Sequence, residues 1–149
     1  MRVVGLDLGE RRIGVAVSDG AGALAVPHTV VERSADASAD RAALARIVEE
    51  LDGRLVVVGL PLSLDGRDGP AAERIRGEAA ALADVLTVPV ELVDERFTTV
   101  SANRALADAG VRGRARRRVV DQVAAAILLQ TWLDGHRAGA PSESRTESS

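Results

Sequence analysis

The sequence predicts an α/β fold, in which a mixed five-stranded sheet combines a three-strand antiparallel meander with parallel strands and carries helices on both faces. Three short apolar runs joined by brief polar turns open the chain, which favours a meander. Amphipathic segments then alternate with short apolar, β-branched segments, as is typical of strands joined by crossover helices. A length of 149 residues, 46% of them apolar, suits one domain with its own core.

Turn residues bound each of the three strands of the meander. Residues 2–8 form an apolar run interrupted by Asp7, and a polar turn follows at 9–12. Residues 13–18 form the second strand and end at Asp19-Gly20, a dipeptide common in tight hairpins. Residues 24–31 form the third strand. Because the connections are so short, the three strands are expected to pair antiparallel.

The second half of the chain alternates helices and strands. Apolar residues at positions 44, 47, 48 and 51 predict a helix that ends at Gly53, and the β-branched run 55–60 predicts a strand buried on both faces. A second helix begins near Pro70 and is followed by a strand at 88–93. Thr98 or Thr99 can cap a third helix, which stops at Gly110.

The last predicted helix spans residues 119–133 and is closed by Gly135. Beyond it the chain is rich in Ser, Glu, Arg, Gly and Pro. We therefore expect one domain over residues 1–134 and a disordered polar tail over 135–149.

Composition excludes several classes of site. The chain has no Cys, which excludes disulfides, thiolate metal sites and a Cys nucleophile. Phe97 and Trp132 are the only aromatic residues besides two His, so no aromatic surface exists for stacking successive bases. His28 and His136 suit no obvious chemical role. The sequence has no apolar run of membrane-spanning length and no signal pattern, so we expect a soluble cytoplasmic protein without a membrane partner.

Basic charge is concentrated in one segment, although the whole chain has a net charge of −3. Residues 111–120, here called the Arg-rich segment, carry no acidic residue and contain Arg112, Arg114, Arg116, Arg117 and Arg118. Cations at the start of a helix oppose its dipole, so this placement points to an anionic partner such as nucleic acid. The alternative is a solvated helix start. Arg11 and Arg12 could extend the same surface.

Three carboxylates are candidates for chemistry. Asp7 lies in an apolar strand among small residues, where a charge is unfavourable unless it is paired or binds a metal, although it could simply start a turn. Asp94 and Glu95 end the fifth strand on opposite faces, so at most one points into a site. Asp121 lies beside the apolar stripe of the last helix, where it is either functional or on the solvent border of that stripe.

Gly59 ends the fourth strand and has no side chain. If that strand lies between the first and the fifth, Asp7 and Glu95 are two strand spacings apart, roughly 10 Å at the backbone. The space above Gly59 could then hold ions bound from both sides. Carboxylates without Cys or His favour hard cations, so the hypothesis is a site for two Mg²⁺ or Mn²⁺ ions about 3.5–4 Å apart. Asp7 would bridge both ions, with Glu95 and Asp121 each holding one.

Four short motifs follow one another along the chain. They are Gly5-Leu6-Asp7-Leu8-Gly9 with Arg12-Ile13-Gly14-Val15-Ala16, Val58-Gly59-Leu60-Pro61 with Asp65-Gly66, Asp94-Glu95-Arg96-Phe97-Thr98-Thr99, and Val120-Asp121 with Ala124-Ala125-Ile127-Leu128. Together they resemble the YqgF family, also called RuvX-like proteins or pre-16S rRNA nucleases, of the ribonuclease-H-like superfamily. The resemblance covers about residues 2–134. Where family members often have Lys before the last Asp, this chain has Arg.

The resemblance implies a ribonuclease-H-like fold and a metal-dependent nuclease that matures the 5′ end of small-subunit ribosomal RNA. It matches the family's acidic residues to Asp7, Glu95 and Asp121, and the preference for Glu95 over Asp94 rests mainly on it. The Arg-rich segment and Arg67 would bind backbone phosphates. The protein would act as a monomer or a homodimer.

Other readings remain open from the sequence. The same site could serve a Holliday junction resolvase acting on branched DNA. A phosphotransferase or ATPase of the actin–sugar-kinase type has a similar Asp-x-Gly loop, but normally needs two such domains. A non-catalytic RNA-binding assembly factor predicts that Asp7, Glu95 and Asp121 do not converge.

Overall fold

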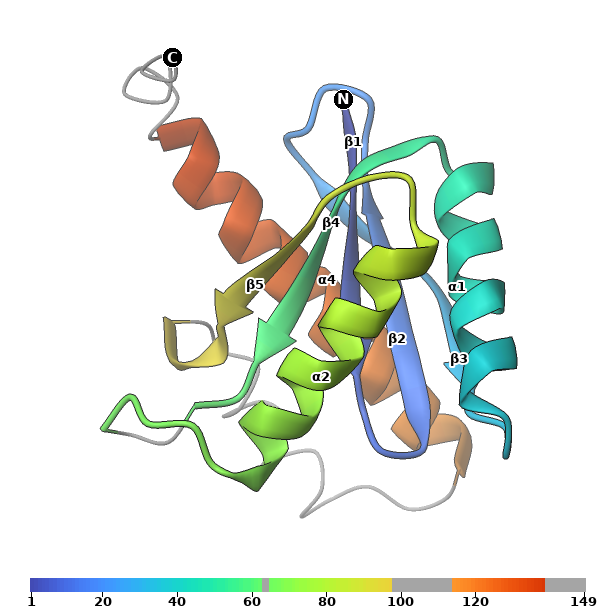
Figure 1. The fold of residues 1–149 in the computed structure, drawn as a ribbon. Helices are drawn as coiled ribbons and strands as arrows, with labels where there is room; N and C mark the ends of the chain where they lie inside the picture. The colour runs from blue at the N-terminus through green and yellow to red at the C-terminus, as the bar shows by residue number, and fades with distance from the viewer. Residues whose placement is uncertain (63–64, 98–113, 139–149) are drawn as a thin grey trace.

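The computed structural model describes residues 1–62, 65–97 and 114–138. Its centre is a five-stranded sheet in the order β3-β2-β1-β4-β5 (Figure 1). The strands are β1 (Arg2–Leu8), β2 (Arg12–Ser18), β3 (Ala25–Glu32), β4 (Gly53–Leu60) and β5 (Val90–Asp94). The first three pair antiparallel, whereas β4 and β5 run parallel to β1. The predicted mixed sheet is confirmed, and β4 lies between β1 and β5 as the site hypothesis assumed.

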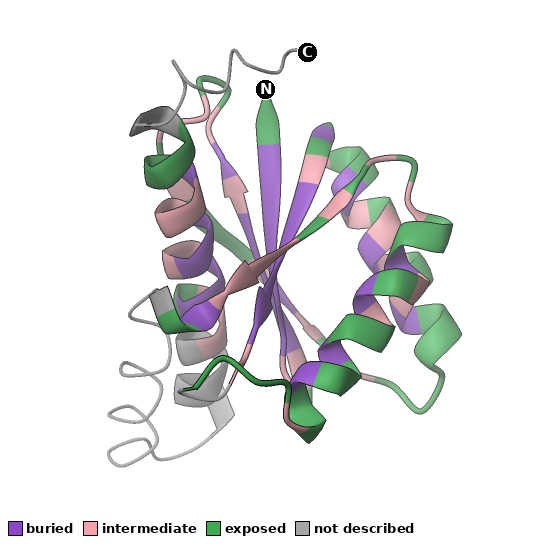
Figure 2. Ribbon diagram, turned by 60° about the vertical axis from the view of Figure 1, so that its left-hand side comes forward, coloured by how far each residue is buried: buried purple, intermediate pink, exposed green. Residues whose placement is uncertain are grey.

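Helices cover both faces of the sheet (Figure 2). On one face lie α1 (Ala37–Glu50) and α2 (Pro70–Val85), and on the other lies α4 (Arg114–Ala138). Local sequence explains where the first two begin: the Asp36 carboxylate accepts hydrogen bonds from the backbone N–H groups of residues 38 and 39, and Pro70 occupies the first turn of α2. None of the described helices is long and apolar enough to cross a membrane.

The two faces of β1 differ in the size of their side chains. Val4, Leu6 and Leu8 pack into a large aliphatic core beneath α1 and α2. The opposite face carries small residues, and a Cβ atom added to Gly5 would lie 2.9 Å from the Cβ of Leu129 on α4. Gly14 of β2 is as tightly covered, because an added Cβ would overlap the carbonyl oxygen of Asp121. These glycines allow α4 to approach the sheet closely.

The last helix differs from its predicted bounds at both ends. It begins at Arg114 rather than at 119, so most of the Arg-rich segment is helical. It also continues through Gly135 to Ala138, so the predicted helix end at Gly135 is wrong. A glycine inside a helix is unfavourable by only about 1 kcal/mol. Here the rings of Trp132 and His136, one turn apart, stack across Gly135 with centroids 3.7 Å apart. Residues 139–149 and the predicted third helix lie outside the described residues.

Candidate carboxylate site

Asp7 lies near the carboxyl end of β1 and is 4% exposed. Strand alternation places it on the same face as Val3 and Gly5, which is the face that α4 covers. Its partner across the β1–β2 pair is Gly14, which also lacks a side chain. A buried aspartate is therefore held on a face where its neighbours leave room around it.

Glu95 follows β5 as the first residue of the short 3₁₀ helix η1 (Glu95–Phe97) and is 7% exposed. Its side chain lies over Gly59 of β4, because a Cβ atom added to Gly59 would be 2.7 Å from Glu95 Oε2. The sequence predicted that the missing side chain leaves space over the middle strand. The structure shows that the Glu95 carboxylate reaches into that space from the edge strand.

Asp7 and Glu95 line the same pocket, which has a volume of about 210 Å³. The β1–β2 turn, the end of β4 and the first turns of α2 form the rest of its wall. This is the edge of the sheet at which the parallel strands end, where sheets of this kind commonly bind their ligands (Figure 1). Two buried carboxylates from strands on either side of β4 thus meet in one concave site.

Asp94 is held away from this pocket. Its carboxylate accepts hydrogen bonds from the guanidinium of Arg96 (Nη2 to Oδ2, 2.7 Å) and from the Arg96 backbone N–H (2.9 Å). Hydrogen bonding by Arg96 holds the pKa of Asp94 below its usual value, against a smaller opposing effect of burial. Of the two adjacent acids, Glu95 is the one that shares a pocket with Asp7, and Asp94 forms a local ion pair.

Asp121 lies on α4, and its backbone carbonyl lies against Gly14, the residue of β2 that pairs with Asp7. Its carboxylate pairs with Arg12: Arg12 Nε lies 2.8 Å from Asp121 Oδ2, and both side chains are mostly buried. It does not line the pocket of Asp7 and Glu95. Within the described residues, no three His, Cys, Asp or Glu side chains are grouped closely enough to hold one metal ion. The structure therefore brings two of the three predicted acids together and places the third nearby.

The predicted phosphate-binding arginines are scattered. Arg11 is exposed in the β1–β2 turn, and Arg12 is occupied by Asp121. Arg67 is 84% exposed and pairs with Asp65 at 3.0 Å. Arg112 lies outside the described residues, as do the side chains of Arg114, Arg116, Arg117 and Arg118. The backbone of the helix that carries these four begins at the same edge of the sheet as the pocket (Figure 1).

Arg74 is a residue of the pocket that sequence reasoning missed. It lines the wall together with Ala71, which lies three residues earlier on the same face of α2, and with Ile75. The available signal was that the second helix begins near Pro70 and follows the fourth strand along the chain. The first turns of a helix that follows a parallel strand lie near the carboxyl ends of the strands, where a polar residue such as Arg74 is a candidate.

Carboxylate oxygens are suitable donors for a hard divalent cation. Asp7 and Glu95 are buried together, and Gly59 offers no side chain that would fill the space between their strands. Two such carboxylates in a pocket repel each other, and a bound cation would relieve that repulsion. The residues present therefore fit a magnesium-type ion, with Asp121 as a further donor only after it leaves Arg12.

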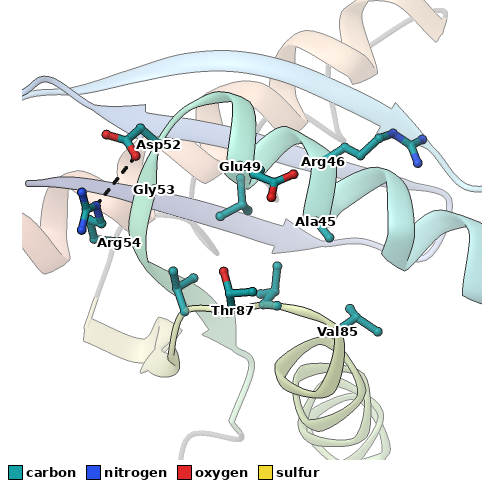
Figure 3. A pocket seen from close by; sticks show the side chains of 11 residues that line it. Ala45, Arg46, Glu49, Asp52, Gly53, Arg54, Val85 and Thr87 are labelled. Atoms are coloured by element: carbon teal, nitrogen blue, oxygen red, sulfur yellow. Dashed lines mark ion pairs between the residues drawn. The ribbon is translucent and has the colours of Figure 1, made fainter.

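A larger hollow lies at the opposite end of the sheet, where β4 begins (Figure 3). Its volume is about 460 Å³, and its charged lining is mixed: Arg46 and Glu49 from α1, and Asp52 and Arg54, which pair at 3.8 Å. It contains none of the candidate acids. The candidate site is therefore chosen by its two buried carboxylates and not by its size.

Comparison with known proteins relates this geometry to a family. The family model RuvX, described as Holliday junction resolvase, matches residues 1–135. The chain belongs to the RuvX family. This result confirms the resemblance found in the four motifs, and the match includes Asp7, Glu95 and Asp121.

Relatives in the RuvX family match along nearly their whole length. A protein of Myxococcus xanthus (strain DK1622) named "Putative pre-16S rRNA nuclease" is 53% identical over 137 residues, which is 92% of this chain and 90% of the relative. A protein of the same name from Mycobacterium sp. (strain KMS) is 48% identical over 145 residues, covering 95% and 86%.

Among solved structures, Thermus thermophilus RuvC in complex with a Holliday junction substrate matches with a TM-score of 0.60 at 21% identity, covering 92% of this chain and 96% of RuvC. A second structure of the same protein gives a TM-score of 0.55 at 19% identity. At this identity the likeness concerns the fold, and it confirms the predicted ribonuclease-H-like α/β architecture.

Proposed function

We propose that this RuvX-family chain is a nuclease that hydrolyses phosphodiester bonds of ribosomal RNA precursors at the 5′ end of 16S rRNA, in the cytoplasm. The observation that carries the proposal is the pocket that buried Asp7 and Glu95 both line, with the Glu95 carboxylate over Gly59. The names of relatives about half identical over nearly their full length support the substrate. The chain has no cysteine, and no histidine is among the described residues that line this pocket, so the carboxylates are its candidate catalytic groups.

Asp7 and Glu95 would hold a divalent cation, Mg²⁺ or Mn²⁺, and Asp121 would complete a two-ion site. Such ions supply an activated water and stabilise the leaving oxygen in phosphodiester hydrolysis. The chain's own contribution is to keep the carboxylates buried and fixed: Asp7 by its place in β1, and Glu95 by its seat over Gly59. In the absence of a metal ion, the ion pair with Arg12 holds the Asp121 carboxylate and balances its charge.

Binding of the substrate would rest on arginine. The net charge of −3 attracts no nucleic acid by itself, so local basic groups must neutralise the phosphates. The start of α4, which carries the Arg-rich segment, lies at the edge of the sheet where the pocket opens (Figure 1). An elongated anion could therefore contact this helix and the carboxylate pocket at the same time.

A second candidate function is resolution of four-way DNA junctions. The description of the family model favours it, since it names a Holliday junction resolvase. The same carboxylates would serve either substrate. Comparing the cleavage of a synthetic four-way junction with that of a 16S rRNA precursor, at equal enzyme and Mg²⁺, decides between them. The alternative of a non-catalytic assembly factor predicts that the three acids do not converge. Asp7 and Glu95 share a pocket whereas Asp121 lies outside it, so cleavage by the purified protein is the test that decides this alternative.

The first prediction concerns Asp7→Asn and Glu95→Gln. Each should lower the cleavage rate of an rRNA precursor by about a hundredfold or more, because a metal-ligand carboxylate contributes several kcal/mol to the transition state. The melting temperature of the wild-type protein should also rise with Mg²⁺ concentration, since an ion that binds only the folded state stabilises it. In Asp7→Asn this rise should be smaller or absent.

Asp94→Asn is the matched control, because it changes an adjacent acid that faces Arg96 rather than the pocket. It should keep most of the activity and the full response to Mg²⁺. Cleavage that survives Asp7→Asn in homogeneous protein would overturn the assignment of the site. An equal loss in Asp94→Asn would show that the choice of Glu95 is wrong.

A further inference from the structure

We propose that Arg74 is a substrate-binding residue of the carboxylate pocket and that its guanidinium takes a phosphate group of the nucleic acid backbone. This inference rests on the proposed nuclease function and adds to it a residue outside the acidic set. It depends on three observations: the place of Arg74 in the pocket, the residues that fix its side chain, and the sharing of one carboxylate by two guanidinium groups.

Arg74 is a cationic side chain in a pocket that also contains Asp7 and Glu95. Its side chain is 38% exposed, so part of it remains open to a ligand. Carboxylates alone repel a phosphodiester at short range, and bound cations reverse this only at the metal positions. A guanidinium on the pocket wall offers planar N–H donors that fit the non-bridging oxygens of a phosphate.

An ion pair with Glu78 fixes the orientation of the Arg74 side chain. Its Nη1 lies 3.1 Å from Glu78 Oε1, one turn further along α2. Exposed pairs at this spacing are usually weak and variable. Here Glu78 is itself immobilised, because both of its oxygens accept hydrogen bonds from Arg33 (Nη1 at 2.7 Å and Nη2 at 3.0 Å). A fork-to-fork pair of this kind defines the position of the carboxylate, and with it the position of Arg74.

Arg33 connects this cluster to the strand that carries Asp7. The Arg33 side chain is 17% exposed, and its Nε donates a 2.7 Å hydrogen bond to the carbonyl oxygen of Gly9. Gly9 lies two residues after Asp7 in the β1–β2 turn. The chain of contacts from Gly9 through Arg33 and Glu78 to Arg74 therefore sets the guanidinium at a fixed place relative to the acidic floor of the pocket.

The cluster has an excess of positive charge. Two guanidinium groups, those of Arg33 and Arg74, share the single carboxylate of Glu78. Arg33 directs its donors to Glu78 and Gly9, whereas Arg74 uses Nη1 for Glu78 and is the member of the cluster that lines the pocket. Arg74 is the one basic residue among the described residues that line this pocket, beside the acids Asp7, Glu10 and Glu95. It is therefore the group of the pocket wall that could contact a backbone phosphate directly.

Arg76 provides a matched control on the same helix. It pairs with Asp68, which raises the pKa of Arg76, and it does not line the pocket. Its side chain is 48% exposed. Removing the charge of Arg76 thus changes the net charge of the protein and of α2 by the same amount as removing that of Arg74, but leaves the pocket intact.

The test compares Arg74→Gln, Arg74→Lys and Arg76→Gln in two assays. Steady-state cleavage of an rRNA-precursor oligonucleotide gives KM and kcat, and fluorescence anisotropy in the Asp7→Asn background gives the affinity for the same RNA at several salt concentrations. Arg74→Gln should raise KM by about tenfold and reduce the salt slope of log affinity by about one, as expected for one lost phosphate contact. Arg74→Lys should recover part of the affinity. Arg76→Gln should stay within about twofold of wild type.

Each outcome bears on one of the two proposals. If the wild type cleaves and Arg74→Gln matches Arg76→Gln in KM and salt slope, Arg74 binds no phosphate and the nuclease proposal stands. If the wild type binds RNA without cleaving it, the nuclease proposal fails, and the anisotropy series still decides the role of Arg74. A wild type that neither binds nor cleaves RNA overturns both. Equal melting temperatures of the two Gln variants exclude a difference in folding as the cause.

Discussion

At the scale of single residues, the candidate site depends on two glycines, which have no side chain. Gly59 has no Cβ, and the Glu95 carboxylate occupies the space that one would take. Gly14 has none either, which lets the backbone of Asp121 rest on β2 beside Asp7. Both glycines adopt backbone angles open to other residues, so close approach and not backbone conformation explains their presence.

Gly59→Ala tests this view. The added methyl group would lie 2.7 Å from Glu95 Oε2 and 3.2 Å from Leu128 Cδ2, so the carboxylate must move while the fold remains. We expect a loss of stability of about 1–2 kcal/mol, typical of mild overpacking, together with a loss of cleavage well beyond it. Urea unfolding and single-turnover cleavage measure the two effects.

Gly77→Ala is the control for this substitution, because nothing lies within 4 Å of an added Cβ at that helical position. It should raise stability by up to about 1 kcal/mol, through helix propensity, and leave cleavage unchanged. If Gly59→Ala retained full activity, the seat of Glu95 over Gly59 would be irrelevant to function.

At the scale of elements, the junction of β5 and η1 decides which acid enters the pocket. The Asp94 carboxylate accepts hydrogen bonds from both the backbone N–H and the guanidinium of Arg96, two residues later. Glu95, between them, is directed to the other side and over β4. The Asp94–Arg96 ion pair is thus a local contact of this junction, and neither of its members lines the pocket that Glu95 enters.

This ion pair predicts a pH dependence of stability. Hydrogen bonds from Arg96 lower the pKa of Asp94 in the folded protein, so its contribution is fully present above the unfolded-state pKa, which lies near 4, and is lost as pH falls through the lower folded-state value. Asp94→Asn should abolish this part. The free energy of unfolding of the wild type should thus fall more steeply than that of the variant below about pH 4, measured by urea titration. Parallel curves would show that the pair is not formed in solution.

The elements were largely predictable from sequence, because their signals are local. Alternation and β-branched runs located the strands, and Pro70 located a helix start. The ends of α4 were not predictable in the same way: Gly135 is a stop signal that the stacked pair of Trp132 and His136 overrides.

The candidate site was predictable only in part. Asp7 stands out because a charge interrupts an apolar strand, whereas the Arg12–Asp121 ion pair joins residues 109 positions apart and leaves no local trace. The same holds for the contacts of Arg33 with Gly9 and Glu78, which fix the position of Arg74. Long-range pairing of charges depends on the packed fold, so a pattern along the chain does not show it.

At the scale of the whole molecule, the sheet separates two layers with different tasks. Beneath α1 and α2 lies a large aliphatic core that contains none of the candidate acids. On the other face, α4 packs closely on the sheet, with Ala16 and Ala125 among the buried residues of this layer. The three candidate acids Asp7, Glu95 and Asp121 lie on this side. Figure 2 shows the buried side of α4 against the sheet. Both layers thus supply stability, whereas the candidate acids lie in the α4 layer and α2 of the other layer adds the pocket wall that carries Arg74.

Leu44→Ala and Leu129→Ala separate these contributions. Leu44 is buried in the first layer at 2% exposure and Leu129 in the second at 0%, so each truncation should lower the free energy of unfolding by about 2–5 kcal/mol. At a temperature where both variants remain folded, Leu129→Ala should lose more cleavage activity, since α4 carries Asp121 and its packing over Gly5 sets the distance of that helix from the sheet. Urea unfolding measures the loss of stability, and single-turnover cleavage measures the loss of activity. If Leu44→Ala lost as much activity as Leu129→Ala at equal stability, the two layers would act as one unit and the position of α4 would have no separate role in the site.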